Sequence, residues 1–207
     1  MNLEVIPKPA NISWETITEL LHKAFAEHAE QGLHYSACDQ TTEITRKRCE
    51  NGICLVALLD GMLVGTGTVS FFCKRNKKYG YLSQIAVLPN CKTQGIGTKL
   101  RDEIVDICFK NKVEAIYCNT SEKATKVVNW YVNAGWQKVG MYSYMGTNYY
   151  SIVFRYSIMG HKYALLRAAL SYNLSEIICK LFWLEDGTLS YIGRFLKRIK
   201  YSLKNLF

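Results

Sequence analysis

Residues 79–100 restrict the possible folds of this chain more than any other segment. An apolar run rich in Ile, Val and Leu reaches Pro89, Gly95-Ile96-Gly97 follows six residues later, and Thr98 opens a helical pattern. This order predicts a strand, a turn, a glycine-bracketed loop and a helix start. The two glycines leave backbone amides unshielded at the positive end of a helix dipole, which favours an anion. A tight strand-to-helix connection explains the same residues without a ligand.

Two common phosphate-binding patterns do not fit this segment. A dinucleotide fingerprint needs a third glycine at Leu100, and a Walker loop needs Gly-Lys-Ser/Thr. The segment instead resembles the GNAT superfamily of acyl-CoA-dependent N-acetyltransferases. Their pattern is a strand ending in Val-x-Pro, then Arg or Gln, two residues, Gly, one residue and Gly or Ala. Here it reads Val87-Leu88-Pro89 and Lys92-Thr93-Gln94-Gly95-Ile96-Gly97. Lysine in the leading position keeps the charge but loses the planar fork of arginine.

A second motif strengthens the resemblance. The superfamily has a helix that ends in Tyr, three residues, Gly and an aromatic residue. Tyr131, Gly135 and Trp136 match this pattern after the next predicted strand. Two motifs in the right order are more specific than either alone, and together the resemblance covers roughly residues 3–158.

The resemblance implies a fold class of α/β (α+β) type, with a mixed, mostly antiparallel central sheet flanked by helices. Hydrophobic periodicity and turn residues point the same way. The predicted helices are 14–28, 41–50, 97–110 and 120/121–133, and the predicted strands are 3–9, 54–59, 62–73, 79–88, 113–119, 136–145 and 148–158. Asp60-Gly61 predicts a hairpin turn, and Gly135 a helix end. We expect an acetyltransferase domain over 1–158 and a basic helical extension over 159–207.

The resemblance also implies the cofactor site, which would hold acetyl-CoA as a co-substrate. The strand through Ile85 and Val87 would offer main-chain groups to the pantetheine arm, as an added strand pairs at an edge. The diphosphate would be held by the loop, through Lys92, Thr93, Gln94, Gly95, Ile96, Gly97 and Thr98. Tyr131 would be catalytic, because a phenol with a pKa of about 10 can donate a proton to the departing thiolate. A half-buried aromatic at a helix end is the alternative interpretation of Tyr131.

Two positions depart from the superfamily pattern. Ala124 stands where an Asn often contacts the cofactor arm, and Tyr81 stands where a catalytic Glu sometimes lies. The general base is therefore unassigned, and Glu30, His34 and Asp39 are candidates only. These departures keep a second function open, that of a non-catalytic acyl-CoA-binding or membrane-associated scaffold.

Cysteine usage argues against a metal site or a disulfide framework. No Cys-x-x-Cys pair occurs among the eight cysteines, and Cys54, Cys73, Cys108, Cys118 and Cys179 lie in apolar runs, which favours buried reduced thiols. Cys91, in the loop before the glycines, is the one that we expect to be exposed. No apolar run approaches the length of a membrane span, and the first twenty residues lack the hydrophobic region of a signal peptide, so a cytoplasmic protein is expected.

The basic character lies mostly in the last quarter of the chain. Residues 155–207 hold nine Lys and Arg against three Asp and Glu, whereas residues 1–154 hold 17 against 14. Residues 163–184 are apolar over much of their surface, and Asn173 and Ser175 suggest a division into two helices. Residues 189–207 alternate apolar and basic positions at helical spacing. Packing on the domain or in a homodimer, and a peripheral membrane contact through 189–207, both explain this extension. No nucleic-acid-binding motif accompanies the charge.

The sequence thus predicts an N-acetyltransferase that moves the acetyl group of acetyl-CoA directly to a primary amine of a small molecule or peptide. Neither a metal nor an acyl-enzyme is expected. Tyrosines 142, 144, 149 and 150 could line an aromatic acceptor groove, and core packing explains them equally well.

Overall fold

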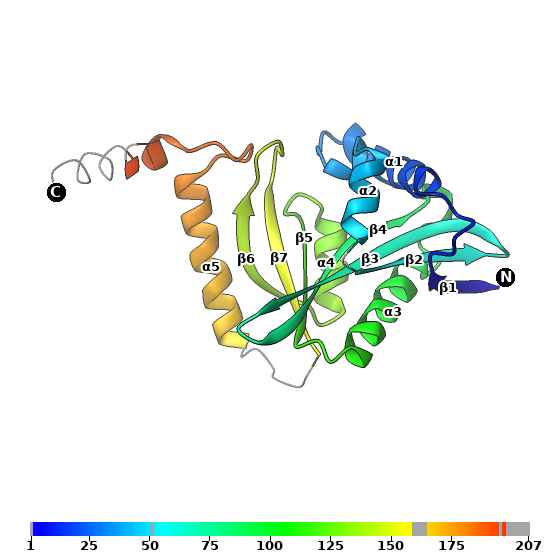
Figure 1. The fold of residues 1–207 in the computed structure, drawn as a ribbon. Coiled ribbons are helices and arrows are strands. Elements are labelled where there is room, and N and C mark those ends of the chain that lie inside the picture. Colours follow the sequence, from blue (N-terminus) through cyan, green and yellow to red (C-terminus); the bar gives the residue numbers. More distant parts are fainter. Residues whose placement is uncertain (1, 51, 159–164, 195, 198–207) are drawn as a thin grey trace. The chain divides into compact units, whose positions relative to one another are not determined.

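The computed structural model describes residues 2–50, 52–158, 165–194 and 196–197 (Figure 1). The chain divides into two compact units, one formed by residues 1–118 and 156–161 and the other by residues 119–155 and 162–207. Each unit is described in turn. The domain boundary expected at residue 158 stays a prediction.

The first unit is built on an antiparallel meander. Its strands are β1 (Leu3–Pro7), β2 (Gly52–Leu59), β3 (Met62–Lys74) and β4 (Lys77–Val87), each paired antiparallel with the next. Asp60 and Gly61 connect β2 to β3 with positive φ angles of 48° and 81°, which a type I′ hairpin turn requires. Strand β5 (Ala115–Ser121) begins in this unit and runs parallel to β4.

Helices cover both faces of this meander (Figure 1). One face carries α1 (Trp14–Glu30) and α2 (Thr42–Cys49), and the other carries α3 (Ile96–Lys110). Short 3₁₀ turns lie at η1 (Ser36–Cys38) and η2 (Pro89–Cys91). Ile17 and Leu21 of α1 are fully buried against Val56 and Ala86 of the sheet. Because both faces are covered, the middle parts of β2 and β3 are buried at consecutive positions, whereas burial alternates along β4.

The second unit contains α4 (Thr125–Asn133), the antiparallel pair β6 (Gln137–Ser143) and β7 (Tyr150–Ser157), and α5 (Leu165–Phe182). Helix α5 is fastened to β6 by its serines. The Ser171 hydroxyl donates to the Val139 carbonyl at 3.0 Å, and the Met141 amide donates to the Ser175 hydroxyl at 2.8 Å.

Strands β5 and β7 pass through both units. The Ile158 amide donates to the Glu114 carbonyl at 3.1 Å in the first unit, and the Glu122 amide donates to the Tyr150 carbonyl at 2.9 Å in the second. These bonds make β5 and β7 antiparallel neighbours. The strand order is β1-β2-β3-β4-β5-β7-β6, and among the described strands only β4 and β5 are parallel. The predicted mixed, mostly antiparallel sheet flanked by helices is confirmed.

Four local predictions were wrong. Helix α5 continues through Asn173 and Ser175 as one helix, and α4 starts after Ala124 without a side-chain cap from Thr120 or Ser121. Cys73 is exposed because β3 extends beyond the core there. Cys91 is buried, because the turn η2 folds its thiol inward.

Within the described ranges, no helix combines the length and apolar character needed to cross a membrane. The helix predicted over 189–207 falls largely outside those ranges, and its described part is helical at residues 191–194 and 196–197.

Candidate active site

Strand β4 loses its partner on one side before it ends. Its register with β3 runs from Lys77 to Val87, whereas its register with β5 covers only Gly80 with Ile116 and Tyr81 with Tyr117. Within the first unit, pairing of β4 with β5 stops at Tyr81, so the following main chain of β4 offers an edge to which an extended chain can add. Ile85 and Val87, predicted from the motif to meet the cofactor arm, lie in this segment.

A bulge marks the middle of the open edge. Gln84 has a φ of 54°, and the register with β3 shifts between Thr66 and Thr68. Gln84 is 8% exposed, and its Oε1 accepts hydrogen bonds from Thr68 Oγ1 at 3.1 Å and Cys49 Sγ at 3.6 Å. Its Nε2 is buried and has no hydrogen-bond partner in the described part of the chain. The bulge thus places the side-chain amide of Gln84 beside the edge, with its oxygen hydrogen-bonded and its nitrogen unsatisfied.

A buried polar network continues from Cys49 under α1 and α2. The hydroxyl of Thr45, which is completely buried, accepts hydrogen bonds from Thr18 Oγ1 at 2.8 Å and from Gln40 Nε2 at 2.7 Å. Arg48 Nη1 donates to Gln40 Oε1 at 2.5 Å. Sequence reasoning missed this network, because its members come from two helices, a loop and two strands that share no local pattern.

The loop after β4 leads directly into a helix with an uncapped start. The Leu88 amide donates to the Val64 carbonyl at 2.9 Å, and η2 then turns the chain. Thr93 and Gly95 have φ angles of 66° and 77°, and Gly95 is the N-cap of α3. A glycine has no side-chain oxygen to cap the first-turn amides, and a Cβ built on Gly95 would meet nothing within 4 Å. First-turn amides without an N-cap side chain, beside a glycine with open space around it, suit a diphosphate.

The predicted loop residues lie together in the structure, but they differ in how far their side chains are exposed. Thr93, Gln94 and Gly95 are exposed, whereas Ile96 is 2% exposed because its side chain anchors α3 in the core. Ile96 can therefore contribute only its main chain. Gly97 and Thr98 lie partly buried in the first turn.

Lys92, at the head of the loop motif, has a carboxylate partner. Its Nζ lies 2.5 Å from Glu27 Oε2 of α1, and both side chains are partly exposed. The neighbouring His28 packs against Phe25 and Tyr35, with ring centroids 5.7 and 5.2 Å away. Burial lowers the pKa of His28, and the nearby Lys92 lowers it further. The imidazole is therefore neutral near pH 7.

Tyr131 lies in the second unit, at the end of α4. Its side chain is 6% exposed, and its ring stacks on Phe154 at 5.1 Å and meets the edges of Trp136 and Trp130 at 5.1 and 4.8 Å. Gly135 has a φ of 81°, which lets the Trp136 amide donate to the Tyr131 carbonyl at 3.1 Å. The motif therefore has a local structural basis, since Gly135 reverses the chain and places Trp136 on Tyr131.

The remaining candidates gather into no further site. Glu30, His34 and Asp39 are all exposed. Of the tyrosines considered for an acceptor groove, Tyr142 and Tyr144 are exposed and Tyr149 is buried, so they do not form one uniform surface. No cluster of three or more His, Cys, Asp or Glu side chains able to hold a metal occurs among the residues that the structure describes.

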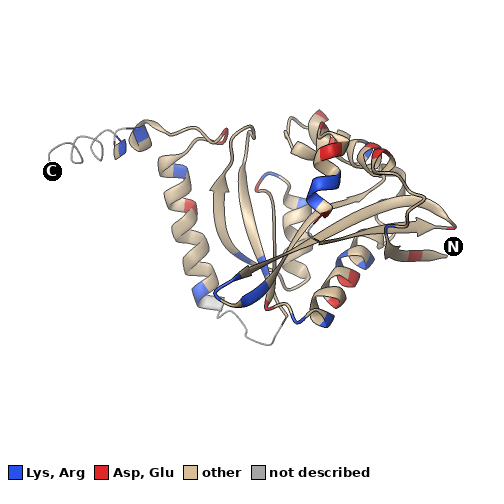
Figure 2. Ribbon diagram, viewed as in Figure 1, with Lys and Arg blue, Asp and Glu red and all other residues tan. Residues whose placement is uncertain are grey.

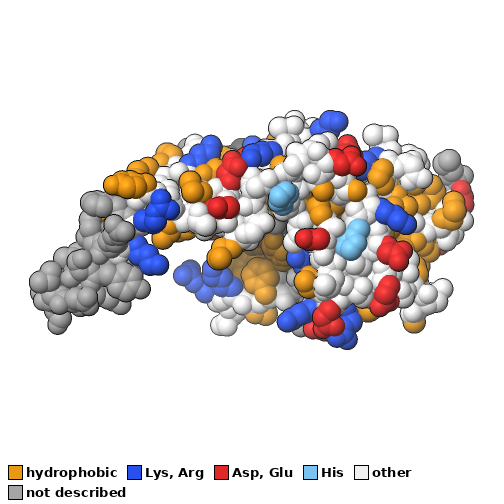
Figure 3. Space-filling model, turned by 90° about the horizontal axis from the view of Figure 1, so that it is seen from above, with side chains coloured by type: hydrophobic (Ala, Val, Ile, Leu, Met, Phe, Trp, Pro, Cys, Tyr) orange, Lys and Arg blue, Asp and Glu red, His pale blue; other side chains and the backbone are white. Residues whose placement is uncertain are grey.

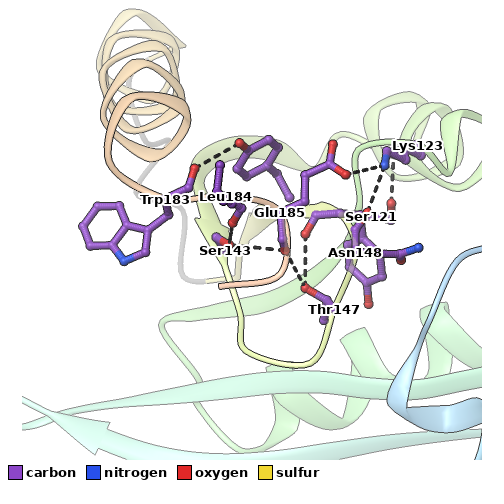
Figure 4. Close-up of polar contacts among 10 residues, drawn as sticks. Ser121, Lys123, Ser143, Thr147, Asn148, Trp183, Leu184 and Glu185 are labelled. Carbon is purple, nitrogen blue, oxygen red and sulfur yellow. Dashed lines mark hydrogen bonds and ion pairs between the residues drawn. The ribbon is translucent and has the colours of Figure 1, made fainter. Parts of the chain in front are cut away.

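Polar contacts tie the segment after α5 to the β6–β7 hairpin within the second unit (Figure 4). Lys123 Nζ lies 2.7 Å from Glu185 Oε2 and donates to the Asn148 carbonyl at 2.9 Å. The Thr147 hydroxyl donates to the Glu185 carbonyl at 3.1 Å, and the Tyr150 hydroxyl to the Trp183 carbonyl at 3.1 Å. This segment is thereby held against the hairpin.

Solved structures of acetyltransferases share this fold. A GNAT family acetyltransferase from Elizabethkingia anophelis with acetyl-CoA bound has a TM-score of 0.58 and 16% identity, over 75% of this chain and 98% of that one. The NatC complex bound to Gag peptide and CoA gives 0.61 and 16%, over 76% and 99%. The IAA acetyltransferase from Bacillus cereus ATCC 14579 gives 0.58 and 16%, over 75% and 99%.

No curated protein matches the sequence. The family model described as acetyltransferase (GNAT) family matches residues 14–136, which is more than half of the chain and contains both motifs. The chain belongs to the GNAT family of acetyltransferases, and the predicted acyltransferase activity is that of its family.

Proposed function

We propose that this protein transfers the acetyl group of acetyl-CoA directly to a primary amine of a small molecule or peptide. One observation carries the proposal: the open edge of β4 runs, through a single turn, into the uncapped amides of α3. That order suits a ligand with an extended amide arm followed by a diphosphate. The acetyl-CoA bound to the E. anophelis enzyme and the CoA bound to NatC support this assignment.

Different residues of the chain would bind the two parts of the cofactor. The main chain of Ile85 and Val87 would pair with the pantetheine arm, and the amides from Thr93 to Thr98 would bind the diphosphate with help from Lys92. Exposed Thr93, Gln94 and Gly95 form the accessible part of this loop. The phosphate charges fit both the helix dipole and the lysine ammonium.

The transfer needs three proton movements. The amine nitrogen attacks the thioester carbonyl carbon, the carbon–sulfur bond breaks and CoA departs as a thiolate, while the new amide nitrogen loses its extra proton to water. We assign Tyr131 as the acid that protonates this thiolate, on the strength of its position in the Tyr-x-x-x-Gly-aromatic motif. The attacking amine must first lose a proton, because an ammonium has no free electron pair. The chain offers no carboxylate at Tyr81, so we assign this step to water.

A matched pair of glycine variants tests the cofactor loop. Gly95→Glu should abolish acetyl-CoA binding, because a carboxylate would occupy the diphosphate position. Gly61→Glu is the control, since Gly61 also has a positive φ and open space but lies in the β2–β3 turn. Calorimetry with acetyl-CoA should show normal affinity for the control alone. Equal affinities for both variants would show that the loop does not bind the diphosphate.

Turnover is tested by thiol release from acetyl-CoA in the presence of a panel of primary amines, including peptides with free N-termini. Release that depends on the amine supports transfer. Tight acetyl-CoA binding without amine-dependent release would favour the alternative, a non-catalytic acyl-CoA-binding protein. The proposal also includes a cytoplasmic location and a homodimer.

A further inference from the structure

Helix α5 presents apolar side chains on two sides. Its inner side packs on β6 through the buried residues Ala168 and Cys179 and the bonded Ser171 and Ser175. Its outer side carries a stripe of exposed Leu and Ile at helical spacing. The stripe consists of Leu170, Leu174, Ile177, Ile178 and Leu181, which are 40–63% exposed. A helix that is apolar all round is normally covered all round, so the stripe calls for a partner outside this unit.

The chain beyond α5 continues the apolar surface and adds basic and aromatic groups. Trp183 and Tyr191 are exposed, and the Ser190 hydroxyl donates to the Leu181 carbonyl at 2.6 Å, which folds residues 188–194 back onto the end of α5. Arg194 and Lys197 are exposed there. Figure 3 shows hydrophobic side chains beside Lys and Arg in this part of the molecule, and Figure 2 shows basic residues on α5 and after it.

We propose that the outer stripe of α5 lies on an anionic membrane surface. This inference is independent of the transfer reaction. Exposed Trp and Tyr beside Leu and Ile are typical of protein segments at a membrane–water interface, because these aromatic side chains have an apolar ring and a polar group that stays hydrated. Arg155 is buried on β7, but residues 159–207 still hold eight Lys and Arg against three Asp and Glu, which adds electrostatic attraction to acidic lipid headgroups.

A second copy of the chain fits the stripe less well. A stable interface takes about 800 Å² from each partner, which is more than five partly exposed Leu and Ile side chains supply. Two copies would also bring two positively charged segments together, and like charges repel. A lipid surface meets neither objection, because it adapts to a narrow stripe and carries the opposite charge.

Vesicle sedimentation with the full chain tests the proposal. Wild-type protein should pellet with phosphatidylcholine vesicles containing phosphatidylserine, and less so with pure phosphatidylcholine or at high salt. The double variant L174E/I177E should lose binding at least fivefold. Phe109→Glu is the control, because Phe109 is 64% exposed on α3 of the first unit, and it should bind as wild type does.

Circular dichroism and the melting temperature confirm that each variant is folded, and both substituted positions are already about 60% exposed. Light scattering on the same samples tests the competing partner. A wild-type dimer that L174E/I177E converts to a monomer would overturn the proposal in favour of self-association. Unchanged pelleting of the double variant, or no pelleting of the wild type with acidic vesicles, would also overturn it.

Discussion

The ammonium of Lys92 lies 2.5 Å from a carboxylate oxygen of Glu27, so the cation at the head of the proposed cofactor loop is already paired with an anion of α1. A bound diphosphate would compete for the same ammonium and would meet the negative charge of Glu27 nearby. The pair is partly exposed and contributes only about 0–1 kcal/mol. Glu27 is therefore expected to weaken acetyl-CoA binding slightly.

Glu27→Gln should accordingly lower the dissociation constant of acetyl-CoA by about two- to fivefold, the range that 1 kcal/mol allows. Calorimetry at low salt measures this, and the gain should shrink at high salt, where charges are screened. Glu30→Gln, an exposed carboxylate at the end of the same helix, is the matched control. An equal gain from Glu30→Gln would mean that general charge, not release of Lys92, is responsible.

The hydrogen bond between Thr68 and Gln84 should contribute more to stability than an exposed pair does. Thr68 is fully buried, and its hydroxyl donates to Gln84 Oε1 at 3.1 Å. Thr68→Val keeps the shape of the side chain but removes a hydrogen-bond donor to a buried amide oxygen. The free energy of unfolding should fall by about 1–2 kcal/mol. Adding Gln84→Met should recover part of that loss, because it also removes the unsatisfied Nε2. Urea unfolding of both single variants and the double variant measures the coupling, and strictly additive losses would contradict the assigned contact.

Tyr131 allows structure and chemistry to be separated by two substitutions. Tyr131→Phe keeps the ring that stacks on Phe154 and meets Trp136, so the melting temperature should stay within about 2 °C. Turnover should fall about 100-fold or more, with little change in the KM for acetyl-CoA, if the phenol is the acid. Tyr131→Ala should instead cost about 3–4 kcal/mol, because it empties the space among these rings. Full turnover by Tyr131→Phe at saturating acetyl-CoA would remove the hydroxyl from the mechanism.

Local signals account for what the sequence predicted correctly. Asp60-Gly61 and Gly135 both required positive φ, and both have it. The apolar, β-branched runs predicted the strands of the meander, and the Gly95 loop predicted the start of α3 to within a residue. These features depend on residues that are close together in the sequence, so the sequence alone predicts them.

Contacts between distant segments account for what the sequence did not predict. Gln84 gains its importance from Cys49 and Thr68, 35 and 16 positions away. The Ser175 hydroxyl donates to the Tyr172 carbonyl of its own helix at 2.8 Å, yet the helix is not divided there, because the same oxygen accepts the Met141 amide and helps to hold α5 on β6. Burial of Cys91 likewise depends on where η2 packs, which no local pattern shows.

His28 should make the protein less stable in mild acid. Its pKa is lowered by burial and by Lys92, and its Nδ1 is buried without a hydrogen-bond partner among the described residues. The folded state therefore resists a proton that the unfolded chain accepts below about pH 6.5, so stability falls as the pH drops through that value. His28→Phe keeps an aromatic ring against Phe25 and Tyr35 and removes the titration. Its melting temperature should drop roughly 1–3 °C less than that of wild type between pH 7 and pH 5. Substitution of the exposed His34 by Gln should leave the wild-type pH dependence in place. A loss of that dependence in His34→Gln alone would show that His34, and not His28, causes the loss of stability in acid.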